Sequence, residues 1–467
     1  TSRAWLAGAG LAYLLRRGSS SNHVVLQSLV SICVLDSRHS AARLRSNARR
    51  LLGALYFVTA VAKCNDGWVE PRTSCAVLYT VAGGAVVGVA TWPAIVLSAL
   101  PYGALVGEFW LAGALWWWEA LTPAAQLAVV TAGALFHCGL AAPRPPLSVY
   151  PFSALMAPLF ALVTAAADTH DGDDDDDGWD TTASALAVAA AAVPVVVAAV
   201  PRAAEPLFEY PPYASWRFGL AWCVAAFAAV WTRALLAHLA LRRRRRACGV
   251  APPEAPPPPP PQRTVGAAAV LLLAVGAMPY AGARTHPCFG MFSNARLEVR
   301  SNHWLFGDAV LRRLDVFGGA MRTVATVERS TLAAVNSMRV DLGDFLVDVD
   351  AAALRTANAS SEFVISPPAA HWPADRTPAV LRTPFHVPYL ELRRRVSTAW
   401  SAASAAGEPF VLEFTKHHND KTRRRRLELF ANGTLSGDLH LVRPLPPLKA
   451  YLHRFRTLDL DKSPCRH

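Results

Sequence analysis

A lysine stands at the end of an apolar run early in this chain. Lys63 follows the stretch from Tyr56 to Ala62 and directly precedes a polar turn that leads to Trp68. A lysine at the hydrocarbon boundary of a membrane protein is costly, so it either extends its amine to water or takes part in chemistry. A desolvated amine loses its proton more easily, which suits a general base. Lys63 is the first candidate catalytic residue, with extension to water as the structural alternative.

Two histidines and two glutamates add to this set. His23 follows Asn22 and opens an apolar run, and His137 lies within another such run. Glu108 and Glu119 lie eleven residues apart, close to three helical turns, so both can face the same side of one helix. Each has a structural alternative: a helix cap, a hydrogen-bonded core histidine, or a carboxylate paired with a basic neighbour. Together they supply more ionisable groups at span ends than structure requires.

Several other kinds of site are not indicated by the sequence. It shows no glycine-rich phosphate loop, no nucleophile elbow and no zinc-ligand spacing, so we expect no metal site. The aspartates from Asp173 to Asp177 lack the ligand spacing and closing glutamate of a calcium loop, which favours a solvated acidic loop. Cys64 and Cys75 flank the lysine loop, where a disulfide and free thiols are both open.

The composition indicates a membrane protein. Hydrophobic residues make up 53% of the 467 residues, and charged residues make up 17%, below the usual value of about 25%. The apolar residues gather in runs, several of which approach the ~20 residues needed to cross a bilayer. We expect a polytopic α-helical membrane domain with about eight or nine spans. The expected spans are Val24–Leu35, Leu51–Ala62, Ala76–Leu100, Gly103–Leu121, Pro123–Ala142, Pro151–Ala167, Ala183–Val200, Trp216–Leu241 and Thr264–Ala281.

The net charge of +12 does not indicate a nucleic-acid partner. The arginines form three short blocks, at 242–246, 393–395 and 423–426. The first follows an apolar run, where positive residues mark the cytoplasmic end of a span. The other two lack the interleaved aromatic residues of a nucleic-acid groove. Solvated faces and contacts with membrane lipid are expected for them.

A change in composition predicts two domains. Residues 1–283 form the membrane domain, including an arginine- and proline-rich cytoplasmic linker at 242–263, and residues 284–467 form a soluble domain. If the linker is cytoplasmic, the last span carries the chain to the lumenal or extracellular side. The glycosylation sequons at Asn358 and Asn432 agree with that side. Cys288 and Cys465 bracket this domain and could close it with a disulfide.

The second domain is expected to be small and α+β, with a short antiparallel sheet. A helix is predicted at 388–406, followed by a three-stranded meander with Asn/Gly-bearing turns. The predicted strands are Phe410–Lys416, Leu427–Phe430 and Leu439–Val442. At the other end, the chain begins with Thr and shows no signal-peptide layout, so a processed or incomplete N-terminus is expected.

The order of these motifs resembles the vitamin K-dependent gamma-carboxylase family, which shares a horizontally transferred transmembrane domain, and in particular its microbial and algal members. The resemblance is strongest over Tyr56–Glu70, which aligns without a gap with the stretch that holds the family's catalytic lysine. The other matching segments, in order, are Ser21-Asn22-His23 with Asp36, Glu108, Glu119, Phe136-His137, Phe152–Met156, Met278-Pro279-Tyr280, Met291–Asn294 and Arg300–Trp304.

The resemblance implies a membrane enzyme that uses reduced vitamin K or a similar quinol, with oxygen and carbon dioxide as co-substrates and no metal. Lys63 would deprotonate the quinol and His23 would assist at the quinone site. Oxygen then converts the quinol to an epoxide. The strong base so generated removes a γ-proton from a glutamate of a secreted protein, and carbon dioxide traps the carbanion. Asn22, His137, Trp68, Glu108 and Glu119 would support the quinone pocket.

The family also implies a location in the endoplasmic reticulum, another endomembrane or the plasma membrane. One departure concerns Ala62, which stands where vertebrate members have the first of two adjacent lysines. No residues match the family's propeptide- or glutamate-binding surface, so quinol oxidation is better supported than carboxylation. A non-catalytic membrane scaffold or lipid- or quinone-binding protein is the alternative. A transporter is less favoured, because the sequence shows no inverted repeat or paired broken helices.

Overall fold

The structure is a computed structural model of the chain. It describes residues 25–26, 28–30, 32–33, 41–71, 74–86, 89, 91–143, 150–164, 216–247, 266–281, 297, 301–314, 323–336, 362–364, 385–418 and 421–446. The contacts divide the chain into two compact units, each presented here by itself. The first is the helical unit (Thr1–Ala60, Leu78–Trp92 and Tyr102–Ala274), and the second is the mixed unit (Val61–Val77, Pro93–Pro101 and Val275–His467).

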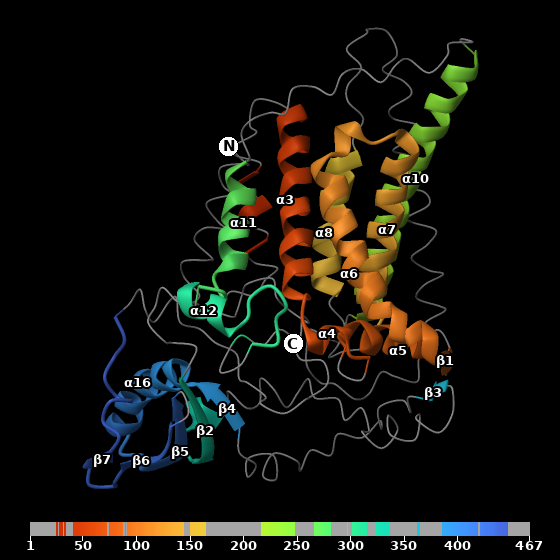
Figure 1. Cartoon of the computed structure of the whole chain (residues 1–467). Helices are drawn as coiled ribbons and strands as arrows, with labels where there is room; N and C mark the ends of the chain where they lie inside the picture. The colour runs from red at the N-terminus through yellow and green to blue at the C-terminus, as the bar shows by residue number, and fades with distance from the viewer. Residues whose placement is uncertain are drawn as a thin grey trace. The chain divides into compact units, whose positions relative to one another are not determined.

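The helical unit is built from long apolar helices that run side by side (Figure 1). Its main helices are α3 (Ala41–Ala62), α6 (Ala94–Trp116), α7 (Pro123–Ala141), α8 (Tyr150–Thr164) and α10 (Trp216–Ala247). Within the described residues, three helices are long and apolar enough to cross a bilayer: Ala94–Trp116, Pro123–Ala141 and Gly219–Arg243. The helices Leu155–Thr164 and Ala267–Ala277 (α11) are apolar but shorter. The membrane character expected from the composition is therefore present in the described residues. The predicted span Ala183–Val200 lies outside them, as does part of Val24–Leu35.

Small residues let these helices approach closely. A Cβ placed on Gly133 of α7 would lie 2.3 Å from Phe160 of α8, and one on Gly53 of α3 would lie 3.1 Å from the carbonyl oxygen of Ala112 in α6. Helix α7 begins with the Thr122 side chain, which accepts from the amide of Ala125, and with Pro123 at its first position. Proline there is favoured because its missing N–H would be unpaired in any case.

The predicted span Ala76–Leu100 is wrong as a single helix. Helix α5 covers Cys75–Val86, the short strand β1 covers Thr91–Pro93, and α6 begins at Ala94. The physical reason lies in Gly84 and Trp92: the indole of Trp92 lies against Gly84, where a Cβ would be 2.8 Å from the indole nitrogen. The chain therefore folds back here, and α6 starts nine residues before the predicted span at Gly103.

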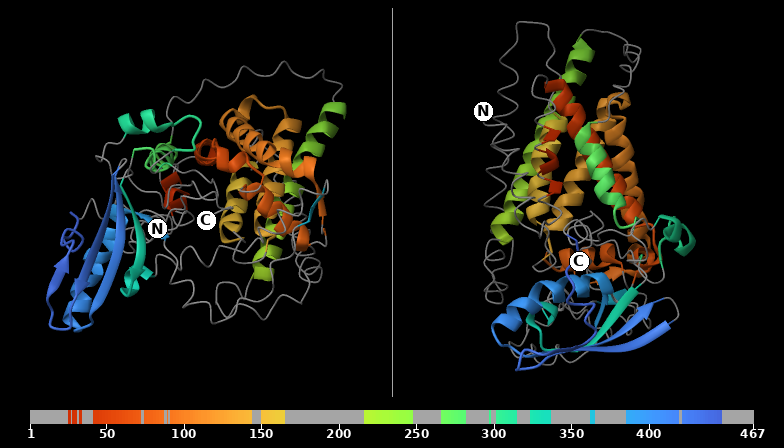
Figure 2. Two further views of the ribbon diagram at one scale, coloured as in Figure 1. Left: turned by 60° about the horizontal axis from the view of Figure 1, so that its bottom comes forward. Right: turned by 90° about the vertical axis from the view of Figure 1, so that its left-hand side faces the viewer.

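The mixed unit contains a five-stranded antiparallel sheet with the strand order β4-β2-β5-β6-β7. Its strands are β2 (Thr323–Ser330), β4 (Phe385–Pro388), β5 (Phe410–His418), β6 (Lys421–Leu429) and β7 (Leu435–Gly437). Helix α16 (Tyr389–Ala405) packs against β2 and β4 and covers one face of the sheet (Figure 2). The unit also contains α4 (Asp66–Val69), α12 (Asp308–Leu314) and β3 (Glu362–Val364).

Alternation along β5 explains this layering. Phe410, Leu412 and Phe414 are buried and point toward α16, whereas the residues between them are only partly buried. Such a period of two is what a strand with one covered face requires. Leu427 and Leu429 of β6 extend the same apolar layer.

The small antiparallel sheet and the helix at 388–406 are confirmed, but the strands differ in detail from those predicted. The segment Leu439–Val442 is a turn, and the last strand is β7, which ends at Gly437. Gly437 adopts φ +102° and lies against the carbonyl of Arg426, and the chain leaves the sheet after it. Strand β6 begins six residues earlier than predicted and includes the whole arginine block 423–426. The sequence analysis also missed β2 and β4, which pair with each other across 60 residues of chain.

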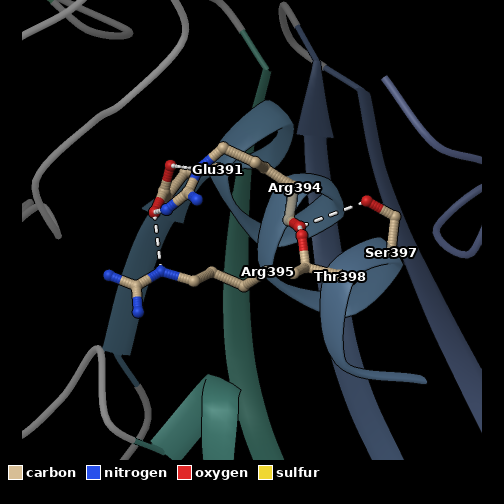
Figure 3. A network of polar contacts seen from close by, with 5 residues as sticks. All are labelled: Glu391, Arg394, Arg395, Ser397 and Thr398. Atoms are coloured by element: carbon tan, nitrogen blue, oxygen red, sulfur yellow. Dashed lines mark hydrogen bonds and ion pairs between the residues drawn. The ribbon is translucent and has the colours of Figure 1, made fainter. Parts of the chain in front are cut away.

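Helix α16 carries a buried carboxylate near its start. Glu391 is 2% exposed and forms ion pairs with Arg394 and Arg395, at 2.5 Å and 2.9 Å (Figure 3). The hydroxyls of Ser397 and Thr398 donate to the carbonyl oxygen of Arg394 in the next turn. A buried charge needs such partners, because one left alone carries a large desolvation penalty. Part of the arginine block 393–395 is thus used inside the unit.

Candidate functional site

Lys63 lies in the turn between the end of α3 and the start of α4, and Asn65 holds this turn. Asn65 is fully buried, its side-chain amide donates to the carbonyl oxygen of Ala62 at 2.9 Å, and its side-chain oxygen accepts from the amide of Trp68 at 2.9 Å. The first bond satisfies a carbonyl at the end of α3, and the second caps the start of α4. A single side chain therefore fixes the turn on both sides of Lys63.

The amine of Lys63 is buried beside an indole. Lys63 is 7% exposed, and its Nζ lies 5.1 Å from the centre of the Trp68 ring. Trp68 is itself buried, and its Nε1 donates to the carbonyl oxygen of Pro101 at 2.9 Å, which fixes the plane of the ring. The amine is thus held over an aromatic face. Extension of this amine into bulk water, the structural alternative for Lys63, is not what the structure shows.

A distant segment, Ser301–Phe306, closes the Lys63 turn from the outside. The amide of Trp304 donates to the carbonyl of Cys64 at 2.8 Å, and the amide of Asp66 donates to the carbonyl of Asn302 at 3.2 Å. The indole of Trp304 donates to the carboxylate of Asp66 at 2.8 Å. This segment includes much of the motif Arg300–Trp304 that contributed to the family resemblance. Two motifs 237 residues apart in sequence are therefore joined in one hydrogen-bonded frame.

His303 sits at the centre of this frame as a neutral imidazole. Its Nε2 lies 2.7 Å from the carbonyl oxygen of Val61, so this nitrogen carries the proton and donates. Its Nδ1 then accepts from the amides of Leu305 and Phe306, at 3.1 Å and 3.3 Å. Burial lowers the pKa of His303 below its ordinary value of 6.5, while the bond to Val61 acts in the opposite sense. The Tyr280 hydroxyl, 3.3 Å from Nε2, completes its surroundings.

His303 and Asn65 were not among the site residues expected from the sequence. Each is a polar residue in a short polar segment, which does not separate a structural residue from a solvated one. The only signal for His303 was its place in the motif 300–304. Asn65 could have been found as the cap residue three positions before Trp68, since asparagine is favoured there.

His137 lies in the helical unit, in an aromatic cage. It is fully buried in α7, and its Nε2 forms a hydrogen bond with the Tyr56 hydroxyl of α3 at 2.8 Å. Its ring stacks on Phe227 of α10, with centroids 5.6 Å apart and planes 4° apart. Phe136, Phe152 and Phe160 also surround it. The sequence-based alternative of a hydrogen-bonded core histidine describes this geometry.

Nδ1 of His137 is buried without a hydrogen-bond partner among the described residues. The same is true of Oγ of Ser153, which directly follows the cage residue Phe152 in the chain. A buried polar atom costs free energy unless it is paired. The cage thus retains hydrogen-bonding capacity that the described side chains do not use. The membership of His137 in a quinone pocket stays a prediction.

Glu108 and Glu119 do not share a helix. Helix α6 ends at Trp116, and Glu119 lies on the separate 3₁₀ turn η1 (Trp118–Ala120). Glu119 is 45% exposed and forms an ion pair with Arg49. The guanidinium of Arg49 also donates to the carbonyl of Val163 and lies over the ring of Trp118. Glu119 therefore joins α3 to the loop after α6, whereas Glu108 is 2% exposed within α6.

The remaining expected residues divide by where they lie. His23, Asn22, Asn358, Cys288 and Cys465 lie outside the described residues. Asn432 lies exposed in the turn after β6, where its side-chain oxygen accepts from the amide of Thr434.

The cysteines beside the lysine loop resolve one open alternative. Cys64 is a buried thiol that forms no disulfide, and burial raises its pKa above the ordinary value of 9.0. Cys75 is disulfide-bonded, so its partner is not Cys64. Concerning metals, no three His, Cys, Asp or Glu side chains gather in a metal-binding arrangement within the described part of the chain.

No family model, curated protein or solved structure matches this chain. The likeness to the gamma-carboxylase family therefore rests on the sequence motifs alone. What the structure adds is the placement of two of those motifs, around Lys63 and around His303, in one frame.

Proposed function

We propose that this chain is a membrane enzyme that oxidises a reduced quinol with oxygen, using Lys63 as the general base. The observation that carries the proposal is the placement of the Lys63 amine, which is buried against Trp68 in a turn fixed by Asn65 and by Ser301–Phe306. A base must be held in position before its proton affinity matters. A turn that is hydrogen-bonded from both sides provides that position.

The surroundings of Lys63 fit a quinol in two respects. Trp68 offers an apolar aromatic wall, and burial keeps most water away from the amine. Exclusion of water protects a strong base from being quenched. The bound quinol would supply the oxygen chemistry, while the chain would supply the base, the orientation and the dry surroundings.

The fuller activity proposed from the resemblance is carboxylation of glutamate in a secreted protein, coupled to epoxidation of reduced vitamin K. This includes a multi-pass topology in the endoplasmic reticulum or a related membrane, with the sheet on the lumenal side. His23 would assist Lys63 at the quinone site. The membrane-spanning character of α6, α7 and α10 supports the membrane part of this proposal.

The first experiment measures epoxide formation. The full chain, purified in a neutral detergent, is supplied with reduced vitamin K and oxygen, and the products are separated by chromatography. We expect epoxide from the parent chain and none above background from Lys63→Ala. Lys63→Arg should also be inactive, because a guanidinium keeps its proton in proteins. The exposed Lys421→Ala is the matched control and should retain full activity.

A Lys63→Ala variant that makes epoxide at the parent rate would remove Lys63 from this role. Carboxylation is tested separately, with labelled bicarbonate and a glutamate-rich peptide. Epoxide without label in the peptide would leave the quinol oxidase and exclude the carboxylase. The two halves of the proposal can therefore fail independently.

One observation favours the alternative, a non-catalytic quinone-binding protein. Both ring nitrogens of His303, the imidazole hydrogen-bonded to the Lys63 turn, are already used in backbone hydrogen bonds. That imidazole is a structural clamp and is not free to move protons. A protein of this kind would bind the quinol and quench the fluorescence of Trp68 but form no epoxide, and Trp68→Phe would remove the quenching.

A further inference from the structure

The two faces of strand β6 carry arginines in different electrostatic surroundings. Arg424 and Arg426 point to the face opposite α16, where Arg424 pairs with Glu328 at 3.0 Å. Arg426 pairs with Glu413 and Glu428 on the same face, at 3.7 Å and 2.8 Å. Among the described residues, this face of the sheet is neutralised by glutamates.

The other face is not neutralised in this way. Arg423 and Arg425 share the face of the apolar core, past the end of the buried leucines of β6. Within the described part of the chain, neither of them forms an ion pair. Arg423 lies directly opposite Lys416 of β5, and Arg425 lies diagonally across from Lys416. Like charges directly opposite each other in a sheet are destabilising.

Further basic side chains complete this corner around Tyr389 of α16. The amine of Lys416 lies 4.0 Å from the centre of the Tyr389 ring, and the imidazole of His440 stacks on the same ring at 6.2 Å. Arg393 of α16 lies within 3.3 Å of His440 through Nη1. We call Lys416, Arg423, Arg425, Arg393 and His440 the Tyr389 corner.

The electrostatics of the corner are those of an excess of positive charge. Burial lowers the pKa of Lys416, and Arg425 and Arg423 lower it further against the single opposing effect of Asp438. Burial likewise lowers the pKa of His440, with Arg393, Lys416 and Arg443 adding to it and Asp438 again opposing. One carboxylate thus acts against several cations that converge from β5, β6, α16 and the turn after β7.

We infer that the Tyr389 corner binds a phosphate group. Lysine and arginine are the residues that recognise phosphate, through charge and through the paired N–H groups of guanidinium. Lys416 and Arg423 are direct partners on adjacent strands, and Arg425 lies two residues along β6 on the same face. The charge of one oxyanion bound between them would relieve their mutual repulsion. The phosphate could come from a soluble molecule or from a lipid headgroup. The inference does not involve Lys63.

The experiment compares two pairs of substitutions that remove the same charge. The full chain in a neutral detergent is titrated calorimetrically at constant ionic strength with two probes, inorganic phosphate and short-chain phosphatidic acid. Short-chain phosphatidylcholine is the zwitterionic control for the lipid. We expect saturable phosphate binding that weakens at least tenfold in Arg423→Gln/Arg425→Gln. In Arg424→Gln/Arg426→Gln it should stay within twofold of the parent chain.

The two probes identify the source of the phosphate. Saturation by both indicates a site for phosphate itself, and saturation by phosphatidic acid alone indicates a headgroup site. Equal weakening in both pairs would mean general attraction to a basic surface and would overturn the inference, as would the absence of saturable binding with either probe. Circular dichroism checks that each variant is folded. If a double variant is unfolded, the phosphate affinities of the single variants Arg425→Gln and Arg424→Gln are compared in its place.

Discussion

At the scale of single residues, the candidate site depends on two buried polar side chains that hold the Lys63 turn in place. Asn65 and His303 are buried, and each bonds to backbone groups on two sides. Removing one of them would leave buried donors or acceptors unpaired, at about 1–3 kcal/mol each. The position of the Lys63 amine therefore depends on the hydrogen bonds of these two neighbours.

The state of His303 predicts a pH dependence of stability. Its folded pKa lies below the unfolded value of about 6.5, so the unfolded chain binds more protons between these two values and stability rises with pH. The contribution of His303 is fully present above about pH 6.5 and is lost as the pH falls below it. Between about pH 7.5 and pH 5, the unfolding temperature should fall less steeply with pH in His303→Asn than in the parent chain, because asparagine does not titrate at position 303. Parallel curves for the two proteins would contradict the assignment.

The bond between Tyr56 and His137 predicts a non-additive pair of substitutions. Tyr56→Phe or His137→Phe alone leaves one buried partner unpaired and should cost about 1–3 kcal/mol of unfolding free energy. The double variant should cost less than the sum, since neither partner then remains unpaired. Chemical denaturation in detergent measures the three values. Strict additivity would mean that the two side chains do not interact.

At the scale of elements, close contacts at glycines and a few buried ion pairs position the helices. Glycine permits the approach of α7 to α8 at Gly133, while Gly139 of the same helix faces open space. In the mixed unit, Glu391 ties the first turns of α16 together through Arg394 and Arg395. Each feature can be tested by comparing a substitution at the contact with the same substitution at a nearby position that lacks it.

Gly133→Ala should destabilise the helical unit, and Gly139→Ala should not. The new Cβ at 133 would lie 2.3 Å from Phe160, which is fully buried and has no room to move. Overpacking of this kind costs about 1–3 kcal/mol. At 139 the alanine should be neutral or stabilising by up to about 1 kcal/mol, because glycine is a poor helix former. Thermal stability in detergent compares them, and equal effects would show that the contact is unimportant.

Glu391→Gln should lower the unfolding free energy of the chain by weakening the ion pairs within α16. It removes the charge from a carboxylate that holds two arginines, and hydrogen bonds to charged groups contribute about 1.5–3 kcal/mol. The exposed Glu408→Gln is the control and should change stability by less than about 0.5 kcal/mol. Circular dichroism during urea unfolding measures both variants. If Glu391→Gln loses no more stability than Glu408→Gln, water compensates for the ion pairs of Glu391 with Arg394 and Arg395.

The sequence predicted elements with strong local signals and missed those that depend on distant pairing. Helix α16 follows Pro388 and has a clear apolar stripe, so its bounds were predictable. The arginines at 423–426 were expected on a solvated face or in contact with membrane lipid, and only pairing with β5 makes that segment a strand. Lys63 and Trp68 are close in sequence, and the short turn between them brings the amine to the indole. His303 reaches the same turn from 242 residues away, which no local pattern indicates.

At the scale of the whole molecule, the open question that the chain itself can report is its orientation in the membrane. If the sheet is lumenal, the exposed sequon at Asn432 should be glycosylated in a eukaryotic host. Asn432→Gln and Thr434→Ala should then give the same faster-migrating band, and a glycosidase should shift the parent chain to it. If the glycosidase does not change the migration of the parent chain, neither Asn358 nor Asn432 is glycosylated, which would contradict a lumenal sheet.

The long sequence separation within the Lys63 turn also bears on how the protein is made. Val61 and His303 are 242 residues apart, which corresponds to roughly 12–48 s of translation. During that interval the lysine has already left the ribosome, but its clamp does not yet exist. A chain that terminates before position 301 would therefore enter the membrane with its amine and without the frame that fixes it. Until the second half of the chain has been made, the Lys63 turn lacks the hydrogen bonds that Ser301–Phe306 supplies.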